Sequence, residues 1–585
     1  MTETDAKIVC TLGPASDDHE TIRDLARAGM RVARLNASHG TREERRALVE
    51  RVRAVGEEVP HPLAVMVDLQ GPEIRTAPLD SPVDLAEGSE VRFVAGDTAT
   101  PEEVGLSTAV VGASEGDRIL LDDGRIETVV VRVEDDAVVA RVESGGELGG
   151  RKGVNAPDVD FDLDVLTEAD RKEVELAVET GADFVAASFV RDAADVLTVA
   201  GAIEDCGGDV PVVAKLERRG AIEHLDEIVE AAYGVMVARG DLGVEYPLEE
   251  VPLIQKRVIR RCQAAGVPVI VATEMLDSMA RSRRPTRAEA SDVANAVLDG
   301  TDAVMLSGET AVGDHPVRVV RTMRTIVGEV EASEEYAELR EQRVPKAGAT
   351  SADSLARSAR YLARDVGARA VVTASESGYT ARKTAKYRPS VPIVAATPDD
   401  AVRRRLALSW GIRPLPVEVA HGTQAVITGA VDAALVADVA ESGDTVVVLS
   451  GMMSDLTDDT TNTLKIHVAA ETLATGKVAV SGRVVGPVFH TRGDLTDAPE
   501  GAILCLPADF DAEFTGDLSR VAGIVAAERG LTGYPAIVAR ELGVPMVSGA
   551  ALPVDRVPDG TVVTLDAERG VVYEGDVLEG SDRGA

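Results

Sequence analysis

The stretch that decides the fold is PVVAKLERRGAIEHLDEIVEAAYGVMVARGDLGVE, residues 211–245. It contains two short apolar runs, at 211–214 and 234–238, with the length and composition of buried strands. Between them, apolar residues recur at the spacing of one helical face. The order strand, helix, strand predicts a βαβ unit of a parallel sheet, whose crossover is almost always right-handed.

Charged side chains follow both strands of this unit. Lys215 and Glu217 come at the end of the first strand, and Arg239 and Asp241 come at the end of the second. The carboxyl ends of parallel strands meet at one edge of a sheet, where such folds bind their ligands. Two carboxylates there can share Mg²⁺, which leaves its other positions to water and substrate phosphate. The pattern favours a phosphoryl-transfer site, and two surface ion pairs are the alternative.

The first half of the chain repeats this unit. Amphipathic segments rich in alanine and arginine separate most of the strands. Eight strand–helix repeats over this length predict an α/β fold of the TIM (β/α)8 barrel type. The strand-like runs, each ending in polar residues, are 7–13, 31–37, 63–69, 184–189, 211–217, 234–241, 268–274 and 303–309.

One connection breaks the repeat. Residues 77–155 carry valine-rich alternating runs separated by Gly/Asp turns, without a helical period. This pattern predicts a small inserted β domain. An insert at the mouth of the barrel is placed to close over a substrate and exclude water. An insertion without a catalytic role remains the alternative.

Two further segments follow the barrel. Strands alternate with helices over 346–472, which predicts a smaller open α/β sheet. Its segment 375–380, SESGYT, joins a strand to a helix and is either a phosphate-binding nest or a simple helix cap. About 100 residues beyond 476 carry more strands. No P-loop pattern occurs in the chain.

The composition is strongly acidic. The 585 residues include 99 Asp and Glu against 61 Lys and Arg, a formal net charge of −38, and only 10 of the basic residues are lysine. A dispersed acidic surface suits concentrated salt, where screening relieves self-repulsion, and makes nucleic acid an unsuitable partner. No apolar run is long enough for a membrane span, and the first residues lack the features of a signal peptide. We therefore expect a salt-adapted cytoplasmic protein.

Short motifs across nearly all of residues 1–470 resemble the pyruvate kinase family. The resemblance implies a barrel catalytic domain at 1–76 and 156–345, a β-barrel lid domain at 77–155 and an α/β regulatory domain at 346–472. It also implies transfer of a phosphoryl group from phosphoenolpyruvate to ADP, giving pyruvate and ATP as the final step of glycolysis. The motifs are KIVCTLGPAS (7–16), GMRVARLNASHG (29–40), DLQGPEIRT (68–76), RKGVN (151–155), ASFVR (187–191), AKLER (214–218), VARGDLGVE (237–245), VATEMLDSM (271–279) and LSGETAVGDHP (306–316).

The same resemblance implies roles for individual residues. Glu217 and Asp241 match the protein ligands of an essential divalent cation, Mg²⁺ or Mn²⁺, and Asp241 also lies at the substrate. Lys215 matches the lysine that stabilises the phosphoryl transition state. The substrate-binding positions are Arg34 at the phosphate, with Gly240 and Thr273 at the pyruvate part. Arg34 and Thr273 count with Lys215 as catalytic positions, with Thr273 on the proton path to the enolate.

A monovalent cation and a nucleotide complete the implied site. Asn36, Ser38, Asp68 and the Leu69 carbonyl match a K⁺ site, and Glu73 matches the K⁺-dependent subgroup. Leu69 and Gln70 stand where many members have Thr-Lys, which leaves room for a carbonyl ligand but not for a hydroxyl ligand. The nucleotide positions are Arg75, Lys152 and His39.

Residues 477–577 resemble the swivelling phosphohistidine domain of phosphoenolpyruvate-using enzymes. The stretch GLTGYPAIVARELGVP at 530–545 follows the pattern of that domain, but Tyr534 stands in place of its histidine. A phosphotyrosine ester does not replace a labile phosphoramidate, so we expect a structural or regulatory role.

Two other functions are the alternatives to a kinase. A dikinase-type phosphotransferase needs the missing histidine and an ATP-grasp domain, neither of which is visible in the sequence. A catalytically dead metabolite-binding paralogue is disfavoured because Arg34, Lys215, Glu217 and Asp241 are all present. The family resemblance further implies a homotetramer and a phosphorylated small-molecule effector, with no nucleic acid or membrane partner.

Overall fold

The computed structural model describes residues 3–108, 110, 112–122, 124–157, 159, 163–420, 422–451 and 461–578. The chain divides into two compact units. The first comprises Met1–Ala347, Ala385–Arg388 and Asp399–Pro414, and the second comprises Gly348–Thr384, Pro389–Pro398 and Leu415–Ala585.

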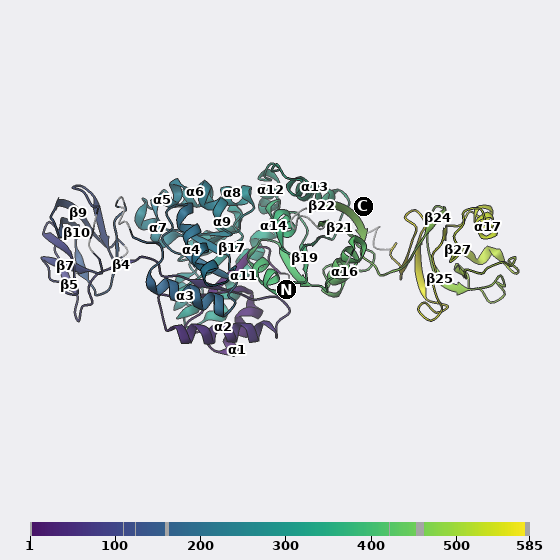
Figure 1. Cartoon of the computed structure of the whole chain (residues 1–585), viewed down its shortest axis with the longest axis horizontal. Helices are drawn as coiled ribbons and strands as arrows, with labels where there is room; N and C mark the ends of the chain where they lie inside the picture. The colour runs from purple at the N-terminus through teal and green to yellow at the C-terminus, as the bar shows by residue number, and fades with distance from the viewer. Residues whose placement is uncertain are drawn as a thin grey trace. The chain divides into compact units, whose positions relative to one another are not determined.

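Eight parallel strands form a closed barrel in the first unit, in the order β1-β17-β16-β15-β14-β13-β3-β2. Figure 1 shows helices around β17 of this barrel. Each strand lies inside one of the eight runs predicted from the sequence, or overlaps it by all but one residue, so the TIM-barrel prediction is confirmed. The strands are β1 (Lys7–Thr11), β2 (Met30–Asn36), β3 (Ala64–Asp68), β13 (Phe184–Ala187), β14 (Val212–Leu216), β15 (Gly234–Ala238), β16 (Val269–Ala272) and β17 (Ala303–Leu306).

Helices follow the barrel strands in sequence. The predicted helix within 211–245 is two short helices, α5 and α6, that meet at His224. The bounds are α1 (His19–Ala28), α2 (Arg42–Gly56), α3 (Glu168–Glu179), α4 (Ala193–Asp205), α5 (Arg219–Glu223), α6 (Leu225–Ala231), α7 (Arg239–Glu245), α8 (Val251–Ala265), η1 (Asp277–Ala280), α9 (Arg287–Asp299), α10 (Gly308–Ala311), α11 (Pro316–Glu331) and α12 (Glu334–Gln342).

The change from strand to helix after β15 matters for the site. The sequence predicted an extended run to residue 241, but β15 ends at Ala238 and α7 begins at Arg239. Gly240 and Asp241 therefore lie in the first turn of a helix and not at the end of a strand.

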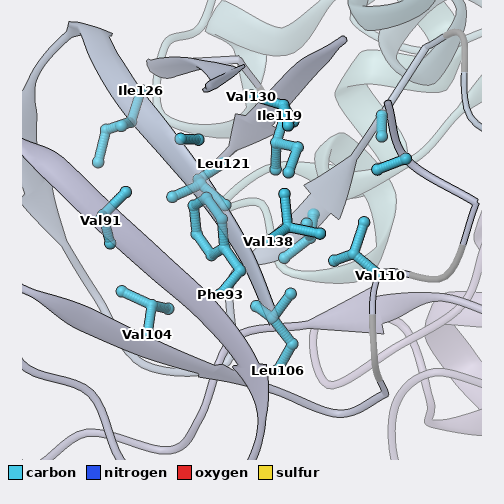
Figure 2. Packing of buried hydrophobic residues seen from close by; sticks show 14 of the residues in the cluster. Val91, Phe93, Val104, Leu106, Val110, Ile119, Leu121, Ile126, Val130 and Val138 are labelled. Atoms are coloured by element: carbon cyan, nitrogen blue, oxygen red, sulfur yellow. The ribbon is translucent and has the colours of Figure 1, made fainter. Parts of the chain in front are cut away.

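The connection after β3 folds as a seven-stranded sheet in the order β4-β12-β8-β9-β10-β6-β7, together with the pair β11-β5. Its core is one cluster of aliphatic side chains around Phe93, and Figure 2 shows Val91, Leu121 and Val138 beside that ring. The strands are β4 (Ile74–Arg75), β5 (Val83–Leu85), β6 (Glu90–Ala95), β7 (Glu103–Leu106), β8 (Arg118–Leu121), β9 (Ile126–Val133), β10 (Ala137–Ser144), β11 (Gly146–Leu148) and β12 (Gly153–Asn155).

A five-stranded sheet with the order β20-β19-β18-β21-β22 follows the barrel in sequence. Parallel pairs join β18 to β19 and to β21, and β22 is antiparallel to β21. The elements are α13 (Ser351–Asp365), β18 (Ala370–Ala374), α14 (Tyr379–Lys386), β19 (Ile393–Thr397), α15 (Asp400–Arg405), η2 (Leu406–Leu408), β20 (Ile412–Pro416), α16 (Thr423–Val436), β21 (Thr445–Gly451) and β22 (Thr461–Val468).

The last segment forms an eight-stranded sheet, in the order β23-β30-β29-β25-β26-β27-β28-β24. The elements are β23 (Thr472–Thr475), β24 (Lys477–Val480), β25 (Arg483–His490), β26 (Ala502–Leu506), η3 (Leu518–Arg520), β27 (Val521–Ala526), α17 (Tyr534–Leu542), β28 (Met546–Ser548), β29 (Val562–Asp566) and β30 (Val571–Glu574). Across the described residues, none of the helices has the length and apolar character needed to cross a membrane.

Candidate active site

The barrel register brings the predicted side chains to neighbouring strand ends. Arg34 lies near the end of β2, and Asp68 is the last residue of β3. Lys215 lies at the end of β14, and Glu217 follows it. Thr273 comes directly after β16. Because all of these strands are parallel, the residues share the carboxyl end of the barrel, which is where TIM-barrel enzymes place their active sites.

A buried charge cluster forms the centre of this site. Lys215 Nζ lies 2.8 Å from Glu217 Oε1 and 3.2 Å from Asp68 Oδ1. On the other side of Asp68, Arg34 Nε donates to Oδ2 at 2.5 Å. Arg34 Nη1 also donates to the Thr11 hydroxyl at 2.9 Å. Asp68 thus joins the two cationic side chains, and both carboxylates are at most 2% exposed.

Asp68 and Lys215 stay ionised because each faces groups of the opposite charge. Burial alone raises the pKa of the Asp68 carboxyl, but Arg34 and Lys215 outweigh burial and hold that pKa below its usual value. Burial alone lowers the pKa of the Lys215 ammonium, but Asp68 and Glu217 outweigh it and raise that pKa above its usual value. Lys215 is therefore a permanent positive charge at neutral pH.

Ser188 is a member of the site that the sequence reasoning did not single out. Its hydroxyl accepts a hydrogen bond from Lys215 Nζ at 2.6 Å and donates to the Leu69 carbonyl at 2.7 Å. The next residue, Phe189, has φ +57 and donates its backbone N–H to Glu217 Oε2 at 2.7 Å. The available signal was position, because Ser188 directly follows β13 inside the motif at 187–191.

Oxygen donors at the site suit hard cations. Glu217 and Asp241 are the two carboxylates expected at a divalent ion. Among the described residues, no group of three or more His, Cys, Asp or Glu side chains is placed to hold a metal. This sparse set fits Mg²⁺ or Mn²⁺, which takes one or two protein carboxylates and completes its shell with water and substrate.

The residues predicted for K⁺ lie at or just after the ends of the adjoining strands β2 and β3. Asn36 and Asp68 are register partners, and the Ala37 N–H donates to the Asp68 carbonyl at 2.8 Å. Asn36 Oδ1 accepts from the Ser38 N–H at 3.1 Å. Asp68 Oδ1 is buried without a well-aligned hydrogen bond. That oxygen already faces Lys215 Nζ at 3.2 Å, so the fit to K⁺ rests on the chemistry of the donors, which are the oxygen atoms that hard cations prefer.

The residues predicted at the nucleotide lie on three segments of the chain. Arg75 in β4 pairs in register with Gly153, next to Lys152. Arg75 donates to Glu73 at 2.7 Å, and Lys152 contacts Asp122 at 2.8 Å. His39 is exposed in the loop after β2. The structure thus places Arg75 in β4, Lys152 directly before the neighbouring strand β12, and His39 on a separate loop.

Gly240 and Thr273 approach each other closely. A Cβ atom at Gly240 would lie 2.8 Å from Thr273 Cγ2, a distance that real Cβ contacts do not show. Thr273 itself has φ +74, an unusual conformation for a β-branched residue. Glycine is therefore required at 240 for α7 to start beside the Thr273 side chain.

The fold and this site are those of the TIM-barrel enzyme class, with buried cationic side chains and carboxylates that meet at the strand ends. Three family models match the chain. The pyruvate kinase barrel domain matches residues 3–320, the pyruvate kinase alpha/beta domain matches 353–467, and the mobile domain of PEP-utilising enzymes matches 498–570.

Curated relatives agree with these matches. A pyruvate kinase from Geobacillus stearothermophilus is 41% identical over 582 residues, covering 97% of this chain and 98% of the relative. One from Staphylococcus aureus is 39% identical over 577 residues, with the same coverage. A crystal structure of a pyruvate kinase from Cryptosporidium parvum has a TM-score of 0.75 and 35% identity, covering 80% of this chain and 96% of that one.

The chain belongs to the pyruvate kinase family. Its enzyme class is accordingly that of a transferase, and its C-terminal segment is the mobile domain found in PEP-utilising enzymes. The predictions of the family, the fold class and the enzyme class are confirmed.

Proposed function

We propose that the chain transfers the phosphoryl group of phosphoenolpyruvate to ADP, giving pyruvate and ATP, at the carboxyl end of the barrel. The observation that carries this proposal is the buried cluster in which Asp68 joins Arg34 to Lys215 and Lys215 contacts Glu217. Phosphoryl transfer depends on positioning and on neutralising several oxygens, more than on a covalent nucleophile. The cluster offers two fixed cationic groups for that purpose.

Each side chain of the cluster has a separate role in this proposal. Arg34 binds the phosphate of the substrate. Its guanidinium group is oriented by hydrogen bonds to Asp68 and to the Thr11 hydroxyl. Lys215 faces the transferring group and stabilises the charge that develops on its oxygens. Ser188 and the two carboxylates keep its ammonium in place before the substrate arrives. Preorganisation of this kind removes a reorganisation cost from the reaction step.

The pyruvate part of the substrate lies between α7 and the turn after β16 in this proposal. The backbone amides at the start of α7, around Gly240, are available to a carboxylate. Thr273 lies beside them, where its hydroxyl is suited to the path of the proton that the enolate must gain. Asp241, in the same helical turn, serves both the substrate and the divalent cation.

We assign Glu217 and Asp241 to Mg²⁺ or Mn²⁺, and Asn36, Ser38, Asp68 and the Leu69 carbonyl to K⁺. When bound, these ions supply positive charge to the phosphoryl oxygens. The nucleotide phosphates are assigned to Arg75 and Lys152, with His39 nearby. Binding of the nucleotide requires Arg75 to exchange its contact with Glu73, and Lys152 its contact with Asp122, for phosphate oxygens.

The proposed division of labour assigns catalysis to residues 1–76 and 156–345 and the closing lid to 77–155. Regulation falls to 346–472. Residues 477–577 are assigned a structural or regulatory role, because Tyr534 accepts a hydrogen bond from the Phe514 N–H and stacks on its ring, where a carrier domain needs a histidine.

We propose a phosphorylated small molecule as effector at residues 375–380. Within that segment, Gly378 has φ +74 and the Tyr379 N–H reaches the Ser377 hydroxyl at 3.4 Å, immediately before α14. Addition of a sugar phosphate is expected to shift the substrate saturation curve, as measured in steady-state assays. A substrate saturation curve that neither sugar phosphates nor nucleoside monophosphates change would contradict this assignment.

The acidic surface leads us to propose a cytoplasmic homotetramer adapted to concentrated KCl. Concentrated salt screens the self-repulsion of a chain whose formal net charge is −38. Sedimentation and activity measured from low to near-saturating KCl should show an active tetramer at high salt. A fully active tetramer after long dialysis into low salt would contradict the adaptation.

Replacing Lys215 tests the assigned reaction. In a coupled assay of pyruvate formation with ADP, Mg²⁺ and KCl, we expect Lys215→Met to lower kcat by about 10²- to 10³-fold, the usual cost of losing one transition-state donor. The control is Lys172→Met, whose side chain is 60% exposed on α3 and should leave kcat unchanged. A wild-type protein that binds phosphoenolpyruvate but makes no ATP would identify a sensor built on a kinase fold.

Glu73 tests the K⁺ assignment. We expect Glu73→Lys to reduce the K⁺ requirement, because an ammonium group on this side chain supplies positive charge that the wild-type site takes from K⁺. Initial rates are compared over a K⁺ titration with a constant total salt concentration. Glu73→Gln is the matched control, since it removes the carboxylate that pairs with Arg75 without adding a cation. Unchanged K⁺ dependence in the lysine variant would contradict the assignment.

A further inference from the structure

Arg239 links two neighbouring strand ends of the barrel. It starts α7, directly before Gly240 and Asp241, and its side chain reaches across to the turn after β16. Nε donates to the Ala272 carbonyl at 3.1 Å, and Nη2 donates to the Thr273 carbonyl at 2.6 Å. The guanidinium group is therefore bonded to the backbone of the residue assigned to the proton path.

The other edge of the same guanidinium group is anchored on a helix. Arg239 Nη1 donates to Asp292 Oδ1 at 2.7 Å, and Asp292 lies within α9. The Arg239 side chain is only 14% exposed. A planar guanidinium held by a carboxylate on one side presents its remaining N–H groups in a fixed direction. Asp292 thus determines where Arg239 holds the turn.

The turn that Arg239 holds is strained. Thr273 and Glu274 both have left-handed backbone conformations, with φ +74 and +53. Such conformations are unfavourable for residues other than glycine and persist only where the surroundings stabilise them. Glu289 and Glu309 accept backbone N–H groups farther along, from Ser278 and Leu276. Arg239 is the side chain bonded to the Thr273 carbonyl itself.

We propose that Arg239 and Asp292 form a positioning pair that holds the Thr273 hydroxyl where the enolate is protonated. The proposal rests on the function proposed above and extends it to residues that touch neither the substrate nor the cations. Because α7 and the turn are joined through one guanidinium group, Gly240, Asp241 and Thr273 keep a common geometry. A displacement of Thr273 by about 1 Å is enough to slow a reaction 10²-fold.

A double-mutant cycle separates this positioning role from a general loss of stability. We expect Arg239→Met to lower kcat by about 10²-fold with little change in the KM for ADP. The exchange of the pyruvate methyl protons with D₂O should fall in parallel, since it reports proton transfer without ADP. In the Thr273→Val background, Arg239→Met should cost little more, because residues that act as a unit are strongly non-additive.

Two further variants guard against misfolding and non-specific effects. Asp292→Asn keeps the size of the side chain and should lower kcat in the same direction but less. Arg261→Met removes a comparable pair, between Arg261 and Asp226, on α8 and α6 and should leave kcat and proton exchange unchanged. Losses that add in the double variant, or a proton-exchange rate that stays at the wild-type level in Arg239→Met, would overturn the proposal.

Hydrogen exchange of the backbone tests the pair independently of activity. Arg239→Met should accelerate amide exchange at Met275 and Leu276, while amides of β14 keep their wild-type protection. Unchanged protection in the turn would overturn the positioning role even if the enzyme were active. An inactive wild type, together with accelerated amide exchange in Arg239→Met, would contradict the proposed function. It would still support the positioning pair.

Discussion

The structure of the site depends on the interaction of Asp68 with two cationic side chains. Desolvation of a carboxylate costs several kcal/mol, and the cost is offset only where partner charges and hydrogen bonds are fixed around it. Arg34 and Lys215 provide those charges from β2 and β14, on either side of β3 and β13 in the barrel order. The closed barrel fixes the strand positions, so the pairing needs no loop to order first.

The charge balance of the cluster supports the proposed use of bound cations. Arg34 and Lys215 are balanced by Asp68 and Glu217, so the four side chains together carry no net charge. Asp241 adds a negative charge at the edge, and the substrates bring several more. A phosphorylated substrate therefore enters a site whose own cations are already paired. In the proposed reaction, additional positive charge from bound ions would offset the cost of moving phosphate oxygens out of water.

Particular residues show how much of the fold and of the site can be predicted from the sequence. The barrel and the strand-end positions of Lys215 and Glu217 follow from apolar periodicity and from the rule that parallel strands end at one face. The reach of Arg239 to Thr273 does not follow, because it depends on the side-chain direction and on a left-handed turn at non-glycine residues. Ser188 was inside a recognised motif, but its contact with Lys215 required the register of β13 with β14. The sequence alone shows that Tyr534 stands in place of a histidine. It does not show that the Tyr534 hydroxyl accepts a hydrogen bond from the Phe514 N–H.

The strained turn and the buried cluster follow the same physical logic. Each holds an unfavourable local state, a left-handed threonine in one and buried charges in the other, and each is stabilised by charge-assisted hydrogen bonds from a neighbouring strand end. Both states would relax if the supporting arginine were lost, since nothing in the local sequence favours them. The function of the site therefore depends on how the strand ends brace one another, as well as on the groups that touch the substrate. Gly240 and Thr273 approach so closely that there is no room for a Cβ atom at position 240, which shows how tightly the two strand ends pack.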